Sequence, residues 1–126
     1  MSFRRTTLLI VDDDPDAREI VSEFARIAGF DIRVAASGIE ALTIAGSEED
    51  LDAVVCDLVM PAMDGLELAH RVRALRPNTA VLLMTGHSTR LDDIVEAGAV
   101  SLIKPFTAET FELAVRDAID AHREDG

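Results

Sequence analysis

Cysteine, lysine and the large aromatic residues are scarce in this chain of 126 residues. Its one cysteine, Cys56, excludes an internal disulfide and a multi-cysteine metal site, and fits a reducing compartment. Tryptophan and tyrosine are absent, which leaves no aromatic cage or base-stacking platform. No signal peptide is visible, and no apolar run approaches the roughly 20 residues that span a bilayer. We therefore expect a cytoplasmic protein that does not enter a membrane.

Positive charge is also scarce. The chain carries 24 acidic residues against 12 lysines and arginines, which gives a net charge of −12. Such a field repels phosphate backbones and anionic lipids, so we expect no direct binding to nucleic acid or to a membrane surface. All the basic residues are arginine except Lys104, and this single exception marks Lys104 as a candidate for a specific role.

Apolar residues are plentiful, at 48% of the chain, and the length is that of one domain. We expect a single domain over residues 1–126, with an ordered core from about 7 to 123, no output domain, and a polar tail that frays after residue 121. Four nearly continuous apolar runs predict strands buried on both faces, while an alternating segment predicts an edge strand. The runs are Leu8–Val11, Ala53–Cys56, Ala80–Met84 and Val100–Ile103, and the alternating segment is Asp31–Val34.

Amphipathic stretches with helix-start signals lie between these strands. They begin at Asp14 with Pro15, at Ser37 with Glu40, at Asp64 with Glu67, at Thr89 and at Thr107. The first is expected to end at Gly29 and the fourth at Gly98. Strands that alternate with helices in this way predict an α/β fold, a doubly wound parallel sheet with helices on both faces.

Four of the five predicted strands are followed by residues, most of them polar, that lie at the sheet edge where such folds bind ligands. They are Asp12, Asp13 and Asp14, then Asp57, then Thr85 and Gly86, then Lys104 and Pro105. Taken singly, each has an ordinary structural explanation, and we interpret Asp14 only as a helix cap and Cys56 as a core residue. Taken together, clustered carboxylates ionise only beside positive charge, and oxygen ligands suit Mg²⁺. Phosphoryl transfer to an aspartate requires this combination of a carboxylate, Mg²⁺, an ammonium group and a hydroxyl.

Four motifs in this order resemble the receiver domain of response regulators in two-component signalling. They are Leu-Ile-Val-Asp-Asp-Asp at 9–14, Cys-Asp-Leu-Val-Met-Pro-Ala-Met-Asp-Gly at 56–65, Met-Thr-Gly-His at 84–87 and Lys-Pro-Phe at 104–106. The resemblance extends from Thr7 to about Arg123. It implies a flavodoxin-like (βα)5 fold with strand order 2-1-3-4-5.

The resemblance also implies a role for each matching residue. Asp57 is expected to be the phosphoacceptor. Asp12, Asp13, Asp57 and the backbone carbonyl of Val59 are expected to hold Mg²⁺, for which Mn²⁺ can substitute. We expect a sensor histidine kinase or a histidine phosphotransfer protein to donate the phosphoryl group, and a downstream effector or a missing output domain to receive the signal.

Further along the chain, Thr85, Gly86 and Lys104 are expected to contact the phosphoryl group, and the resemblance makes the Lys104–Pro105 peptide cis. Thr85 and Ser101 occupy the two switch positions. The family usually has an aromatic residue at the position of Ser101, and the segment between Thr85 and Lys104 is shorter than in many receivers. We therefore expect the switch to act mainly through the backbone of residues 85–90.

We interpret the chain as a phosphoacceptor domain and not as an enzyme that turns over a substrate. Two other functions compete with this interpretation. A Mg²⁺-dependent phosphohydrolase would also use an aspartyl nucleophile, but the haloacid-dehalogenase type needs an acid where this chain has Val59. A binding module without phosphorylation would explain a chain that lacks one of the acids or the lysine. This chain lacks none of them.

Overall fold

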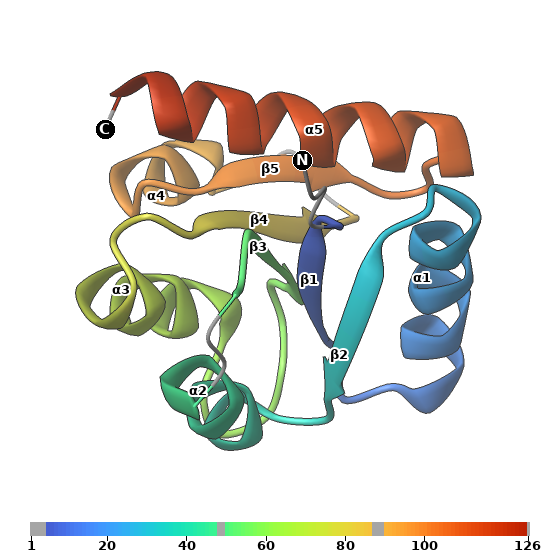
Figure 1. Cartoon of the computed structure of the whole chain (residues 1–126). Helices are drawn as coiled ribbons and strands as arrows, with labels where there is room; N and C mark the ends of the chain where they lie inside the picture. Colours follow the sequence, from blue (N-terminus) through green and yellow to red (C-terminus); the bar gives the residue numbers. More distant parts are fainter. Residues whose placement is uncertain (1–4, 48–49, 87–89, 126) are drawn as a thin grey trace.

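The computed structural model describes residues 5–47, 50–86 and 90–125, which form a parallel sheet covered by helices on both faces (Figure 1). The strand order is β2-β1-β3-β4-β5, as the resemblance implies. The strands are β1 (Thr7–Val11), β2 (Asp31–Ala35), β3 (Ala53–Asp57), β4 (Ala80–Thr85) and β5 (Val100–Ile103). The helices are α1 (Pro15–Ile27), α2 (Gly38–Ser47), α3 (Gly65–Leu75), α4 (Leu91–Glu96) and α5 (Ala108–Asp125).

The core consists of two apolar layers, one on each face of the sheet. Along β1, Leu8 and Ile10 face the layer closed by α1 and α5. Leu9 and Val11 face the opposite layer, which α2, α3 and α4 close. The strand β1 is therefore buried along its whole length and apolar from Leu8 to Val11, and the central parts of β3 and β4 are buried as well. The predicted continuous runs are confirmed for these three strands.

The prediction that Val100–Ile103 is buried on both faces is wrong. This segment forms β5, which lies at an edge of the sheet, and the side chains of Val100 and Ile103 are both 43% exposed. The helix that precedes it, α4, has six residues. An apolar run therefore identified the strand correctly but not its position in the sheet.

Side-chain caps begin α1, α2, α3 and α5 where the sequence predicts them, whereas α4 begins after Arg90, which makes no side-chain cap bond. The carboxylate of Asp14 accepts a hydrogen bond from Asp16 N at 3.0 Å and begins α1. At α2, Ser37 Oγ accepts from Glu40 N at 3.1 Å, and the Glu40 carboxylate accepts from Ala36 N. This is the predicted capping box, with the glutamate bonded one residue further back than usual. The predicted start of the fourth helix, Thr89, lies outside the described residues, as does His87.

The C-terminal helix extends further than expected. We expected the tail to fray after residue 121, but α5 continues to Asp125. Contacts from far along the chain hold its last turns, since His122 Nε2 lies 2.7 Å from the Pro77 carbonyl oxygen and Arg123 bonds to Asp52. These bonds to Pro77 and Asp52 keep the polar end of α5 helical. None of the helices, over the part of the chain described, has the length and apolar character to cross a membrane.

Candidate functional site

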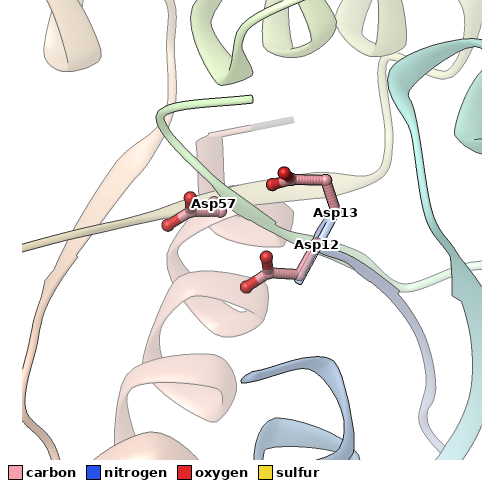
Figure 2. Close-up of side chains that lie close together, drawn as sticks. All are labelled: Asp12, Asp13 and Asp57. Atoms are coloured by element: carbon pink, nitrogen blue, oxygen red, sulfur yellow. The ribbon is translucent and has the colours of Figure 1, made fainter. Parts of the chain in front are cut away.

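Three carboxylates meet at the carboxyl ends of two neighbouring strands (Figure 2). Asp12 and Asp13 follow β1, and Asp57 is the last residue of β3, which pairs directly with β1. One carboxylate oxygen from each residue lies within 4.8 Å of those from the other two. The structure therefore brings together the three acids that the sequence predicts, and their oxygens are close enough to share a cation.

Asp12 is the most constrained of the three. Its side chain is buried, and its Oδ1 accepts a hydrogen bond from Asp14 N at 3.0 Å. Its Oδ2 is buried and has no hydrogen-bond partner among the described residues. Burial raises the pKa of Asp12 above its ordinary value of 3.8, although the hydrogen bond from Asp14 N opposes this shift; the negative charge of Asp57 raises the pKa further.

An unpartnered carboxylate oxygen is costly to bury, because it has lost its hydration and gained nothing in return. A bound cation would remove that cost for Asp12 and offset the repulsion among the three acids. The set contains only oxygen ligands, which suits a hard divalent ion such as Mg²⁺. The residues present therefore fit the metal that the resemblance implies.

Lys104 places a positive charge beside Asp57. Its Nζ lies 2.8 Å from Asp57 Oδ1, and both side chains are partly buried. Its backbone N donates to the Thr85 carbonyl oxygen at 2.8 Å, which holds the ends of β4 and β5 together. The peptide bond between Lys104 and Pro105 is cis, as expected. The one lysine of the chain is thus paired with the predicted phosphoacceptor.

Of the remaining predicted residues, Thr85, Gly86 and Val59 follow or end strands at the same edge, and Ser101 lies within β5. Thr85 is buried at the end of β4, and Gly86 follows it in an exposed position. Val59 lies two residues after Asp57 with a largely exposed side chain. Ser101 is half-buried on β5 and pairs with Leu83 of β4. These positions suit the roles the resemblance implies, and the roles themselves stay predictions.

Cys56 precedes the phosphoacceptor but belongs to the core. Its side chain is completely buried, and its Sγ lies 3.1 Å from the Asp57 carbonyl oxygen. Burial raises the pKa of the Cys56 thiol, and the charge of Asp57 adds to the shift. The residue therefore stays a neutral thiol, and its interpretation as a small core residue is confirmed.

Sequence reasoning missed an apolar groove beside the acids. It has a volume of about 270 Å³ and lies between α1 and the segment after β5. Ile20, Phe24 and Phe106 line it, and Asp12 and Lys104 lie at the same groove. Ile20 fits the apolar periodicity of α1, yet 56% of it is exposed. Periodicity identifies an apolar helix face but not whether another element covers that face.

Arg18 was also missed. It lies in the first turn of α1, and its Nη1 donates to the backbone carbonyl of Asp12 at 2.7 Å. No motif signals a contact between a helix arginine and a backbone carbonyl six residues earlier.

Comparison with known proteins agrees with this geometry. The family model of the response regulator receiver domain matches residues 8–116. The C4-dicarboxylate transport transcriptional regulatory protein DctD of Rhizobium meliloti is 35% identical over 121 residues, which cover 93% of this chain and 26% of DctD. The transcriptional regulatory protein GlrR of Escherichia coli is 31% identical over 123 residues, covering 95% of this chain and 28% of GlrR. The chain spans less than half the length of these curated relatives.

Solved structures of about the same length are similar over nearly the whole chain. The chemotaxis protein CheY4 of Vibrio cholerae superposes with a TM-score of 0.85 at 30% identity, covering 91% of this chain and 99% of CheY4. A response regulator receiver domain protein from Clostridium thermocellum has a TM-score of 0.84 at 27% identity. The superposition covers 96% of this chain and 99% of the Clostridium chain.

Proposed function

The chain belongs to the response regulator receiver domain family, and from this premise we propose that residues 1–126 form one receiver domain, with a core at about 7–123, that accepts a phosphoryl group on Asp57. The observation that carries this proposal is the position of Asp57, which is bonded to Lys104 at 2.8 Å and clustered with Asp12 and Asp13. An aspartate in this setting combines a nucleophilic carboxylate with positive charge beside it.

In the proposed reaction, a carboxylate oxygen of Asp57 attacks the phosphorus of a phosphohistidine. An oxygen–phosphorus bond forms as the phosphorus–nitrogen bond breaks, and the leaving imidazole nitrogen takes a proton from solvent. Lys104 then bonds to the phosphoryl oxygens instead of the free carboxylate. The Thr85 hydroxyl and the backbone at Gly86 donate hydrogen bonds to the same group.

We propose that Asp12, Asp13 and Asp57 hold Mg²⁺, with the Val59 carbonyl as a further ligand and Mn²⁺ as a substitute ion. The unpartnered Oδ2 of Asp12 supports this site. When bound, the ion supplies positive charge that offsets the negative charge of the phosphoryl oxygens. Asp12 and Asp13 orient the site, while Asp57 carries out the chemistry.

The phosphoryl donor proposed is a sensor histidine kinase or a histidine phosphotransfer protein. The apolar groove supports a docked protein donor, because an apolar side chain seated there would contact Lys104, which is bonded to Asp57. The recipient of the signal is a downstream effector protein or an output domain joined to a receiver. This makes the domain a switch that takes up one phosphoryl group rather than an enzyme that turns over a phosphoester.

Incubation with acetyl phosphate and Mg²⁺, followed by mass spectrometry, tests the assignment. The unchanged protein is expected to gain one phosphoryl group, and to gain none when EDTA removes the metal. Asp57→Asn is expected to abolish the gain, because the amide is not a nucleophile. Asp14→Asn is the matched control, since asparagine caps a helix as well as aspartate does. An undiminished mass gain in Asp57→Asn would contradict the proposal, as would multiple turnover of an added phosphoester.

A further inference from the structure

Arg18 holds the peptide group that joins two of the clustered carboxylates. Its Nη1 donates to the Asp12 carbonyl oxygen at 2.7 Å, in a partly buried position. That carbonyl belongs to the peptide unit between Asp12 and Asp13. Because a peptide unit is planar, fixing its carbonyl also fixes the direction in which the chain passes from one Cα atom to the next. One hydrogen bond therefore constrains the backbone of both acids.

The bonding of Arg18 differs from that of the other arginine in α1. Arg26 forms ion pairs with Glu19 and Glu23 on the helix surface, at 3.2 and 3.5 Å. Arg18 pairs with no carboxylate within the described structure, although Asp14 lies one turn earlier. Its guanidinium instead reaches back over the start of the helix to the end of β1. The Arg18 guanidinium is thus bonded to the loop that carries the acids.

A second bond completes the constraint on Asp12. The Asp14 backbone N donates to Asp12 Oδ1, which holds the side chain from the other direction. The carbonyl and one carboxylate oxygen of Asp12 are then both fixed, and Oδ2 is the oxygen left without a partner. The orientation of that oxygen is set by two bonds, one from the backbone of the N-cap Asp14 and one from the side chain of Arg18.

We propose that Arg18 is a positioning residue for the cation site and sets its affinity for Mg²⁺. This inference rests on the proposed function, because it requires Asp12 and Asp13 to be the metal ligands. Groups that orient metal ligands strongly affect metal affinity, and their removal typically weakens binding by roughly 10–100-fold. Arg18 needs no contact with the ion to have this effect.

The direction in which Mg²⁺ affinity changes when Arg18 is removed distinguishes a positioning role from a purely electrostatic one. Arg18 carries a positive charge close to a cation site, so its charge alone disfavours a second cation. If charge dominates, removing Arg18 strengthens Mg²⁺ binding. If positioning dominates, removing it weakens Mg²⁺ binding despite the lost repulsion.

Calorimetric titration of the metal-free protein with Mg²⁺ distinguishes these outcomes. Arg18→Met keeps the aliphatic stem and removes the donor, and we expect the Kd for Mg²⁺ to rise roughly tenfold. Arg26→Met removes the same charge from the same helix, and its Kd is expected to stay within about twofold of the original, because exposed charges are screened. Affinity in Arg18→Met that equals or exceeds that of Arg26→Met would overturn the inference.

A measurement without metal gives a second readout. The amide ¹⁵N shift of Asp13 reports a hydrogen bond to the preceding carbonyl, so it should move in Arg18→Met and stay unchanged in Arg26→Met. An unmoved Asp13 signal would also overturn the inference. If Arg18→Met does not fold, Arg18→Lys keeps the charge but has a shorter donor, and its Kd for Mg²⁺ is then expected to exceed that of Arg26→Met. Failure of the unchanged protein to bind Mg²⁺ would instead overturn the proposed metal site, and this inference with it.

Discussion

At the scale of single residues, Asp12 has the least favourable environment that the described structure records for a carboxylate. It is only 2% exposed, one of its oxygens has no hydrogen-bond partner, and two further acids lie beside it. Sites of this kind are retained for a ligand rather than for the stability of the fold, since an apolar or neutral side chain would be less costly there.

Asp12→Asn is therefore expected to stabilise the metal-free protein at neutral pH, by about 1 kcal/mol, the low end of the cost of an unsatisfied buried group. The folded-state pKa of Asp12 is raised, so ionisation favours the unfolded chain, and stability falls as the pH rises through that pKa. Below pH 3.8, the ordinary pKa, Asp12 is protonated in both the folded and the unfolded state. Its charge then contributes nothing to the free energy of unfolding. Urea unfolding in EDTA at neutral and acidic pH measures the effect; a less stable Asp12→Asn at neutral pH would contradict it.

At the scale of elements, the loop after β3 folds back tightly onto the phosphoacceptor strand. The backbone N of Gly65, the first residue of α3, donates to the Leu58 carbonyl oxygen at 2.8 Å. A Cβ at Gly65 would lie 2.7 Å from the Asp57 carbonyl oxygen and 2.9 Å from Leu58 Cα. Both are backbone atoms, so the helix cannot keep this approach if position 65 carries a side chain.

Gly65→Ala is expected to lower the free energy of unfolding by about 2 kcal/mol, the usual cost of overpacking. Gly46→Ala is the control, because its nearest neighbour would be Leu75 Cδ2 at 3.9 Å, an ordinary contact. Alanine inside α2 should be neutral or stabilise the helix by up to about 1 kcal/mol. Equal stabilities of the two variants in urea would show that the close approach at Gly65 is not a constraint.

Switching should be concentrated in the segment between β4 and α4. Ser101 is half-buried opposite Leu83 and has too little volume to move into space vacated by Thr85. We expect beryllofluoride to shift the amide signals of residues 85–90, of which 87–89 lie outside the described structure, and to leave Ser101 almost unchanged. A dominant change at Ser101 with a quiet 85–90 segment would refute this prediction.

At the scale of the whole molecule, Asp52 joins α5 to the edge of the sheet opposite the acidic cluster. Its Oδ2 accepts from Thr7 N and its Oδ1 from Arg123 Nη2, both at 2.8 Å. The Asp52 side chain is 5% exposed, so the arginine neutralises a buried charge rather than a solvated one. The strands β1 and β3 and the last turns of α5 are thereby held at one point.

Arg123→Met is expected to cost about 1–2 kcal/mol, less than the 3–5 kcal/mol of a fully buried pair because 60% of Arg123 is exposed. Arg71→Met removes an exposed pair with Glu67 and should cost less than about 0.5 kcal/mol. Thermal unfolding measures both, and phosphorylation of Asp57, at the other end of β3, is expected to persist in each. A similar cost for the two variants would show that burial of Asp52 adds nothing.

The sequence alone determined which segments are strands and which residues follow them. Apolar runs and helix caps are local features, so Leu8–Val11, Asp14 and the Ser37–Glu40 pair could be predicted from neighbouring residues. The acids and Lys104 could be placed at one edge because parallel strands end on the same side. The strand order came from the resemblance of the motifs, since periodicity carries no information about neighbours in a sheet.

Only the tertiary structure decided which local features are covered and which side chains meet. It left Val100 and Ile103 of β5 exposed and α1 beside an open groove, although their apolar patterns resemble those of buried elements. It held the polar end of α5 through Arg123 and Asp52, which are 71 residues apart. It also directed Arg18 to a backbone carbonyl instead of a nearby carboxylate. Burial and side-chain contacts depend on elements from distant parts of the chain that pack together. A local sequence pattern therefore cannot predict these contacts.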